Sequence, residues 1–402
     1  MTAHEASGRK VLGSVAKTWS TVPLARRNLL ASKRRLASSV AGIAFAVLLM
    51  MVELGFRNAF IDSMLLAIRQ LDGDIMLVGS AKYQFDRNAP FSRRKLYEAR
   101  AVPGVATARP LYAEQKASIW KNPQDQRLFA VQVFAFDPEQ PVFLLPEIAA
   151  KLDALRQPDT VMVDSRGRSN LGDASAGTET ELTRQNIRVV GTFSLGPSFF
   201  IDGTVIMSDR NFLKLLGGSG PNRTDLPDVE IGVVKVLPGF AVANVQRALR
   251  VAMQPNVTVL TKAELIKQEA QFHAQVSPVG PIFGVGTLVG FAVGVMICYQ
   301  ILFSELSDQL PQYATLKAMG YHNGFLVKVV LQQAAFYALV GYVPAWILCY
   351  LLFWLIGESV LLPMEVSIGL TAVSFALTLA MCVGAALIAV RRVIAADPAE
   401  LF

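Results

Sequence analysis

Few residues in this chain have the type and spacing that catalysis or metal binding requires. Its 402 residues include three cysteines and three histidines, namely Cys298, Cys349, Cys382, His4, His273 and His322. All three cysteines lie in long apolar stretches, where a single thiol usually serves packing. The histidines are scattered, whereas metal sites need ligands at short, regular spacings. The sequence therefore predicts neither a metal centre nor a Cys–His catalytic pair.

Nucleotide hydrolysis is not predicted either. A phosphate-binding loop needs glycines followed by a lysine that reaches the phosphates. The nearest glycine cluster, Gly217-Gly218-Ser219-Gly220, lacks that lysine. A Ser-His-Asp triad would come from distant parts of the chain, and nothing specific indicates one. We therefore expect a non-catalytic chain that binds no cofactor of its own.

Four long apolar stretches dominate the pattern, and 52% of all residues are hydrophobic while 17% are charged. Leu36–Phe56 is apolar apart from Glu53, and Val279–Phe303, Val329–Gly357 and Val366–Val390 contain no Asp, Glu, Lys or Arg. Each exceeds the roughly 20 residues that a helix needs to cross a bilayer. We predict four transmembrane helices. An isolated acid such as Glu53, near the outer end of its stretch, does not suggest proton-coupled transport.

The distribution of charge predicts the orientation. Residues 1–35 carry eight basic side chains and one acid, which accounts for the whole net charge of +7. Arg391 and Arg392 follow the last apolar stretch, and the loop Glu358–Glu365 has acids and no basic residue. Because basic residues favour the cytoplasmic side, both ends of the chain are predicted to be cytoplasmic. Residues 57–278 are then predicted to lie outside the membrane. The basic charge is clustered beside the first span and not spread over a folded face, so it does not indicate a nucleic-acid-binding surface.

The outer residues alternate short apolar strands with helices. Leu111–Lys121 and Arg127–Phe136 flank a turn and predict a hairpin. Such recurring strand and helix units are typical of layered α/β packing. A polar helix over Thr261–Gln275 leads directly into the second span, and Asp62–Gln70 can extend the first.

Three glycines in the second span, Gly286, Gly290 and Gly294, are spaced four residues apart. Small residues at this spacing form a smooth helix face that lets two backbones approach closely. The partner of this face is either another helix of the same bundle or a second copy of the chain. The sequence leaves both open.

The loop after the second span is amphipathic. Leu306, Leu310, Tyr313, Leu316 and Met319 recur at helical spacing on one side, and Gly320 is suited to end such a helix. A face of this kind can lie on lipid, on its own bundle or on a partner protein. Composition alone does not decide among these.

Several segments resemble a known family. An acid after the second span followed by Ala314–Tyr321 (Ala-Thr-Leu-Lys-Ala-Met-Gly-Tyr) is similar to the coupling segment of permeases in the FtsX/MacB group, the type VII or mechanotransmission ABC transporters. The ending Arg391–Leu401 and the order of spans also resemble that group. More narrowly, five stretches resemble DevC-type permeases of cyanobacterial glycolipid export, namely Leu54–Phe56, Arg93–Tyr97, Lys121–Pro123, Gly196–Gly203 and Tyr299–Leu302.

The resemblance implies partners and a site. A separate DevA-like ATPase, which binds ATP and Mg²⁺, would grip the N-terminal stretch and a coupling helix made of Glu305, Leu306, Gln309, Leu310, Tyr313, Leu316, Lys317, Met319 and Gly320. Apolar side chains would form the anchor, with Glu305, Asp308 and Lys317 at its polar rim. The permease would be a homodimer that works with a DevB-like periplasmic adaptor and a TolC-like outer-membrane channel.

The implied function is export of a lipid, glycolipid or other hydrophobic substrate. Two alternatives keep the ATPase: an FtsX-like regulator of a periplasmic cell-wall hydrolase, and a lipoprotein-releasing permease. An outer domain of about 220 residues favours the exporter. A membrane-anchored receptor or enzyme would not need a coupling-like loop.

We therefore expect an α-helical inner-membrane protein with four transmembrane helices and a large periplasmic mixed α/β domain that is MacB-like. The expected segments are a basic amphipathic cytoplasmic segment (1–35), the first span (36–60), the periplasmic domain (61–278), the second span (279–303), the cytoplasmic coupling helix and loop (304–324), the third span (325–357), a periplasmic loop (358–365), the fourth span (366–390) and a cytoplasmic tail (391–402).

Overall fold

The computed structural model describes residues 33–82, 85, 89–216, 228–311, 315, 319, 322–360 and 364–395. The described residues divide into two units. Residues 33–55, 283–352 and 366–395 form a helical unit, and residues 56–282 with 353–365 form an α/β unit. Most of the N-terminal stretch and of the C-terminal tail lies outside the described residues.

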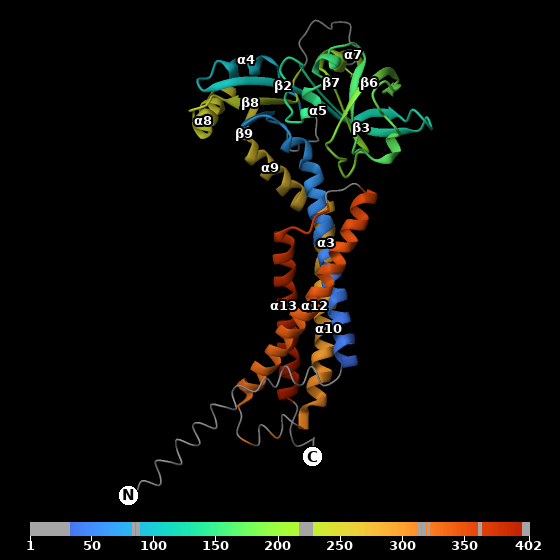
Figure 1. The fold of residues 1–402 in the computed structure, drawn as a ribbon. Coiled ribbons are helices and arrows are strands. Elements are labelled where there is room, and N and C mark those ends of the chain that lie inside the picture. The colour runs from blue at the N-terminus through green and yellow to red at the C-terminus, as the bar shows by residue number, and fades with distance from the viewer. Residues whose placement is uncertain are drawn as a thin grey trace. The chain divides into compact units, whose positions relative to one another are not determined.

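In the part of the chain that the structure describes, the helical unit is built from four long helices, which Figure 1 labels α3, α10, α12 and α13. Their bounds are Lys33–Arg69, Val279–Asp308, Asn323–Val360 and Ile368–Ala395. Within the described residues, each of these helices is long and apolar enough to cross a membrane, over Leu36–Arg69, Val279–Asp308, Val327–Gly357 and Ile368–Arg391. The prediction of four transmembrane helices is confirmed.

Contacts between all four helices hold this bundle together. The thiols of Cys298 on α10 and Cys382 on α13 lie 3.5 Å apart. Tyr342 on α12 donates a hydrogen bond to the backbone carbonyl of Thr371 on α13 at 2.8 Å. A Cβ at Gly341 of α12 would lie 2.6 Å from Ile43 of α3, so these two helices pack at close range. Small residues thus allow the approach that apolar helices in lipid need for association.

The α/β unit contains a four-stranded antiparallel sheet in the order β9-β1-β8-β2. The strands are β1 (Ile75–Gly79), β2 (Val105–Lys121), β8 (Ile231–Val236) and β9 (Val257–Thr261). Helix α4 (Arg94–Arg100) joins β1 to β2, and α8 (Val242–Met253) joins β8 to β9. Two such strand–helix–strand units with interleaved strands make the split βαβ arrangement of ferredoxin-like folds.

Alternating side chains give this sheet two buried faces. Ile75 and Leu77 of β1 join a core that includes residues of α4 and α8. Met76 and Val78 point to the other face and join a core with residues of α3 and of α9 (Lys262–Gln271). The period of two along a strand produces this division. Figure 1 shows α4 and α9 on opposite sides of the sheet.

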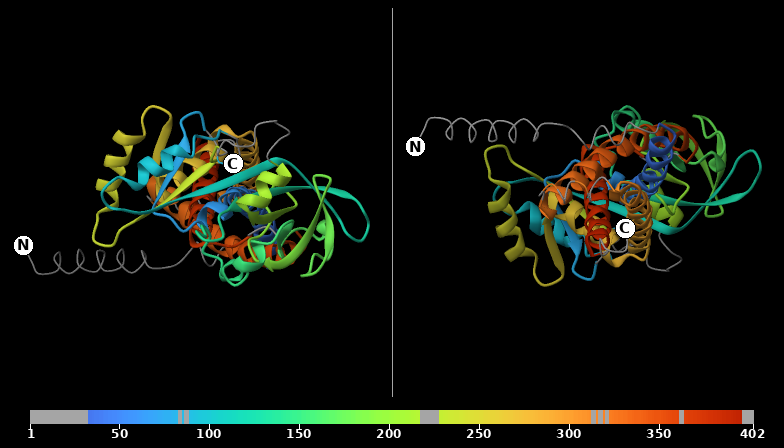
Figure 2. Two further views of the ribbon diagram at one scale, coloured as in Figure 1. Left: turned by 90° about the horizontal axis from the view of Figure 1, so that it is seen from above. Right: turned by 90° about the horizontal axis from the view of Figure 1, so that it is seen from below.

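Strand β2 continues beyond this sheet into a second one, and Figure 2 shows it as a long teal strand. Its second half pairs with β3 (Leu128–Phe136), confirming the predicted hairpin. The sheet proceeds through β7 (Gly203–Ser208), β4 (Thr160–Asp164), β6 (Gln185–Phe193) and β5 (Glu179–Leu182). Trp120 of β2 then pairs with Leu182 of β5, which closes a six-stranded barrel. Closure leaves this sheet without open edges.

Short helices complete the unit: α5 (Pro146–Ala149), α6 (Leu152–Leu155), η1 (Ser169–Leu171) and α7 (Asp209–Leu216). The stretch Pro146–Arg156 has a helical pattern, and the structure divides it into two helices with a break at Ala150 and Lys151. Strand β2 begins at Val105, six residues before the predicted start at Leu111. The prediction started too late because Pro110 lies in the first half of the strand, and proline is disfavoured inside strands.

Candidate coupling site and stalk junction

The predicted coupling residues that the structure describes begin inside α10. Glu305 and Leu306 lie in the last turn of that helix and are 7% and 3% exposed. Gln309 and Leu310 are half-buried just after it, and Met319 is exposed. Tyr313, Leu316, Lys317 and Gly320 lie outside the described residues. The amphipathic prediction can therefore be followed only at its start, where apolar burial is against the chain's own bundle.

Glu305 is held within the bundle by α12. The hydroxyl of Tyr337 donates a hydrogen bond to its carboxylate, and Tyr337 is 1% exposed. The resemblance implied a place for Glu305 at the polar rim of a partner contact. The structure instead turns this side chain inward, because a buried carboxylate is stable only where it finds donors such as this phenol.

The glycine face packs on helices of the same chain. A Cβ at Gly286 would lie 2.6 Å from the carboxyl carbon of Glu53, and one at Gly290 would lie 3.1 Å from Cγ of Met50. At Gly294 it would lie 2.0 Å from the sulfur of Met381. Since Glu53 and Met50 belong to α3 and Met381 to α13, these glycines serve contacts within one bundle.

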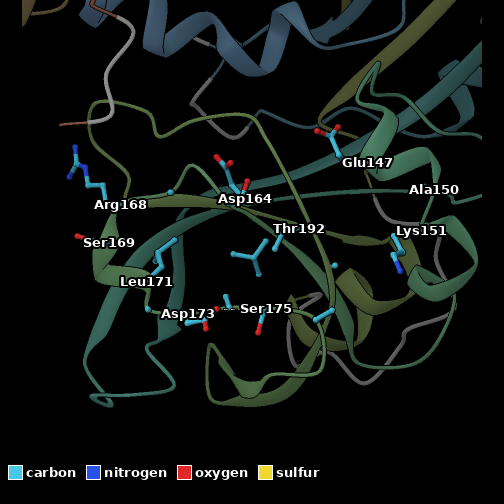
Figure 3. A pocket seen from close by; sticks show the side chains of 17 residues that line it. Glu147, Ala150, Lys151, Asp164, Arg168, Ser169, Leu171, Asp173, Ser175 and Thr192 are labelled. Atoms are coloured by element: carbon cyan, nitrogen blue, oxygen red, sulfur yellow. Dashed lines mark hydrogen bonds between the residues drawn. The ribbon is translucent and has the colours of Figure 1, made fainter. Parts of the chain in front are cut away.

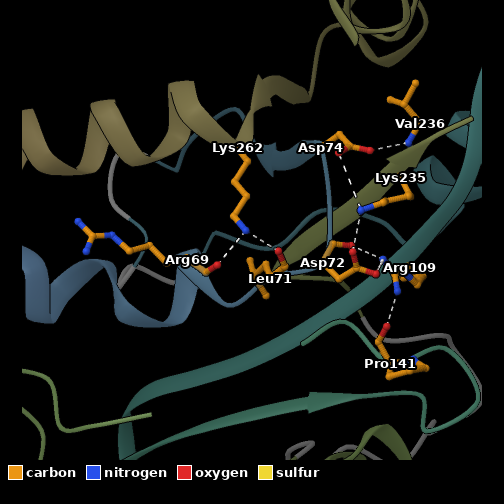
Figure 4. Close-up of polar contacts among 9 residues, drawn as sticks. All are labelled: Arg69, Leu71, Asp72, Asp74, Arg109, Pro141, Lys235, Val236 and Lys262. Atoms are coloured by element: carbon orange, nitrogen blue, oxygen red, sulfur yellow. Dashed lines mark hydrogen bonds and ion pairs between the residues drawn. The ribbon is translucent and has the colours of Figure 1, made fainter. Parts of the chain in front are cut away.

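Two helices of the α/β unit meet at a hydrogen-bonded junction, shown in Figure 4. The ammonium of Lys262, the first residue of α9, donates to the backbone carbonyls of Arg69 at 2.8 Å and Leu71 at 2.7 Å. The last carbonyls of a helix have no partner within it, so Lys262 caps the end of α3. We call residues 57–69 of α3, α9 and the following turn η2 (Phe272–Val276) the stalk.

An ionic cluster ties this junction to the four-stranded sheet (Figure 4). Asp72 accepts hydrogen bonds from Lys235 at 2.8 Å and from Arg109 at 3.1 Å. Burial raises the pKa of Asp72, but these two bonds and charges outweigh it, and the pKa is lowered below 3.8. Burial, together with the nearby charge of Lys235, lowers the pKa of Lys262. The end of α3 is thereby joined to β2 and β8.

An aromatic contact joins the barrel to the stalk. The loop Gly196–Gly203, the aromatic loop, places the ring of Phe199 edge-on to Phe60 of α3 at 5.1 Å between centroids. Phe200 lies 5.9 Å from the same ring, and His273 of η2 lies 5.6 Å from it. Edge-to-face pairs of this kind add stability beyond the area they bury. The barrel therefore packs on α3 of the stalk, and η2 packs on the same ring of Phe60.

Two charged residues hold the aromatic loop in place. The carboxylate of Asp164 accepts the backbone N–H groups of Leu195 at 3.0 Å and Gly196 at 2.7 Å. Arg168 donates to the carboxylate of Asp202 at 3.1 Å and to the carbonyl of Phe199 at 2.8 Å. Burial raises the pKa of Asp164 even though backbone amides stabilise its charged form. The loop is thus fixed at both ends.

Beside these anchors the barrel carries a cavity of about 620 Å³. Its lining combines charged, polar and small residues, among them Lys151, Asp164, Arg168, Leu171, Ser175 and Thr192. Figure 3 shows Lys151 and Arg168 at opposite sides of it. The volume is within the range of small-molecule sites. In the part of the chain that the structure describes, no three His, Cys, Asp or Glu side chains come together as a metal site would require.

The junction was not predicted from the sequence, although one signal for it was present. Thr261 and Glu264 have the spacing of a capping box, and in the structure each side chain accepts the backbone N–H of the other. That pattern fixes the start of α9, and hence the position of Lys262. The aromatic loop was noted only as a family resemblance.

Two family models match this chain. The MacB-like periplasmic core domain matches residues 36–252, and the FtsX-like permease C-terminal domain matches residues 284–398. An uncharacterized ABC transporter permease of Mycobacterium bovis is 25% identical over 386 residues, which cover 92% of this chain and 96% of that protein. Another from Mycobacterium tuberculosis is 23% identical over 382 residues, covering 94% and 98%.

Among solved structures, the periplasmic region of MacB from Actinobacillus actinomycetemcomitans matches with a TM-score of 0.35 at 10% identity, covering 50% of this chain and 92% of that one. The extracellular domain of YknZ from Gram-positive bacteria matches with a TM-score of 0.31 at 10% identity, covering 47% and 98%. With four spanning helices and a periplasmic core domain, this inner-membrane chain belongs to the FtsX/MacB family of ABC transporter permeases.

Proposed function

We propose that the chain is the permease subunit of an exporter in which a separate ATPase moves the periplasmic domain through the stalk. The observation that carries this proposal is the continuity of α3, which is one helix from Lys33 to Arg69. Its end is bonded to α9 through Lys262, and α9 leads through η2 toward α10. Displacement along either helix would reach both the sheet and the barrel.

A hydrophilic pore through the bundle is a poor alternative. Three of the four spans contain no Asp, Glu, Lys or Arg over their predicted apolar lengths. Polar substrates need polar groups along their path through a membrane. Movement of the periplasmic domain fits these spans better.

Force would enter at the cytoplasmic end of α10. Leu310 and Met319 are the described apolar residues that can anchor an ATPase surface there, since neither is fully buried. Glu305 would support this contact from within, by fixing α10 to α12 through Tyr337. The partner ATPase would bind ATP and Mg²⁺, and this chain would bind no cofactor.

Two copies of the chain would work with one ATPase dimer, a DevB-like periplasmic adaptor and a TolC-like outer-membrane channel. The substrate class that fits best is a lipid, glycolipid or other hydrophobic molecule taken up on the periplasmic side, as in DevC-type permeases. The barrel cavity and the stalk-bound aromatic loop support this, because both lie in the unit that would move.

The test replaces Leu310 with Glu, with His322→Glu as the control, because His322 is exposed in the same cytoplasmic segment. Leu310→Glu should insert and purify normally but lose export and the ATPase activity that depends on the complex. The control should retain both. Unchanged export by Leu310→Glu would remove the coupling assignment.

Purified complexes distinguish the exporter from a signalling permease. Capture of an ATPase together with a coiled-coil adaptor supports export. Capture of a cell-wall hydrolase in place of an adaptor would contradict export and favour an FtsX-like regulator.

A further inference from the structure

We propose that the aromatic loop is a membrane-contact surface, with the ring of Phe200 placed at the boundary between headgroups and acyl chains of the periplasmic leaflet. This contact is independent of what the permease exports.

The position of Phe60 along α3 sets the level of the aromatic loop relative to the bilayer. The apolar run of α3 ends at Phe56, and Arg57 is the first charged residue after it. Phe60 follows four residues later in the same helix, which is a rise of about 6 Å. The headgroup layer on each side of a bilayer is about 5–7 Å thick. The rings of Phe199 and Phe200, at 5.1 Å and 5.9 Å from that of Phe60, therefore lie at headgroup level.

The second helical segment of the stalk, α9 with η2, independently indicates the same level relative to the membrane. His273 contacts the ring of Phe60, and the apolar helix α10 begins six residues later at Val279. Val276 and Ile282, on either side of that start, are 68% and 65% exposed. Exposed apolar side chains thus continue from the span of α10 to the turn that carries His273.

Phe200 is 58% exposed in spite of its apolar ring. The loop does not fold it away, because Asp164 fixes the start of the loop and Arg168 fixes its end. Aromatic rings are enriched at membrane interfaces, where one side meets hydrocarbon and the other meets water. Arg57, half-buried one turn before Phe60, is suited to lipid phosphates at the same level. Together these features favour a lipid surface over a protein partner.

The test attaches a nitroxide spin label at Phe200→Cys in the full chain, reconstituted in nanodiscs of phosphatidylethanolamine and phosphatidylglycerol. The native cysteines are at most 1% exposed, and the unmodified chain checks that they stay unlabelled. The matched control is Val251→Cys, because Val251 is 81% exposed on α8, which packs on the sheet face opposite to α3. Collision rates with oxygen, which concentrates in lipid, are compared with those of a water-soluble nickel chelate.

Phe200→Cys should show an oxygen-to-nickel collision ratio several-fold above that of Val251→Cys, and Val276→Cys should agree with it. Equal ratios at Phe200 and Val251 would place the loop in water and overturn the proposal. Protection of the Phe200 label from both reagents would also overturn it, since that result indicates burial against protein. The Val276 label keeps the test decisive if Phe200→Cys fails to fold.

Discussion

The hydroxyl of Tyr337 donates a hydrogen bond to the carboxylate of Glu305, and both side chains are buried between α12 and the last turn of α10. A carboxylate in such surroundings destabilises the fold unless donors compensate for lost water. This bond therefore fixes the end of α10 at the place where the proposed coupling segment begins. A push on that segment would move α12 together with α10.

Removing the phenol hydroxyl should destabilise the bundle. Tyr337→Phe keeps the ring but takes a donor from a buried carboxylate, which costs about 1–3 kcal/mol. We expect a lower thermal midpoint for the purified chain in nanodiscs. Tyr350→Phe is the matched control, because Tyr350 is 58% exposed on the same helix. Equal midpoints for the two variants would show that the Tyr337 bond contributes nothing to stability.

The cap on α3 should matter for both stability and coupling. Lys262→Met keeps the length of the side chain but removes both hydrogen bonds, to the carbonyls of Arg69 and Leu71, for an expected loss of about 1–3 kcal/mol. Lys267→Met, on the exposed side of α9, should behave like the unmodified chain. Thermal unfolding and ATP-driven export are both measured in reconstituted complexes. Full export by Lys262→Met would contradict transmission of force through this cap.

The ionic cluster predicts a dependence of stability on pH. The pKa of Asp72 is lower in the folded chain than its ordinary value of 3.8, so its contribution is present above that value. It is lost as the pH falls through the lowered pKa. Asp72→Asn should therefore be less stable than the unmodified chain at neutral pH, and the difference should shrink below about pH 4.

Thermal unfolding between pH 3 and pH 7 checks this prediction. Asp153→Asn is the control, because the Asp153 side chain is 96% exposed and its pairing with Arg156 at 3.6 Å lies in solvent. Such pairs contribute little. A constant difference between Asp72→Asn and the unmodified chain over this range would exclude ionisation of Asp72 as its cause.

The four spans and the hairpin could be predicted because their signals are local. An uninterrupted apolar run and two strands beside a turn are visible in a short window of sequence. Closure of the barrel could not be predicted, since it depends on the pairing of Trp120 with Leu182, 62 residues apart. Strand β5, which carries Leu182, reads Glu-Thr-Glu-Leu and has no apolar alternation.

The candidate site was predicted only in part for a related reason. Helical spacing grouped Leu306 with the apolar side of the segment, and in the structure this side chain is buried. It could not show that Glu305 also turns inward, because that depends on Tyr337, 32 residues later on another helix. Lys262 likewise carries no signal in the sequence by itself. Its role depends on the carbonyls of Arg69 and Leu71, which lie at and just after the end of α3.

The glycine face allows a sharp comparison between two glycines of one helix. In Gly294→Ala the new Cβ would lie 2.0 Å from the sulfur of Met381 and 3.1 Å from Cβ of Ala46, so either the buried Met381 side chain or α10 must shift. Overpacking of this kind costs about 1–3 kcal/mol. In Gly284→Ala, apart from the chain neighbours and the backbone of α10, no atom of the described residues lies within 4 Å of the new Cβ, so that variant should be neutral or gain up to about 1 kcal/mol from helix propensity. Thermal unfolding in nanodiscs measures both, and a Gly294→Ala chain as stable as Gly284→Ala would contradict close packing of α10 at this point.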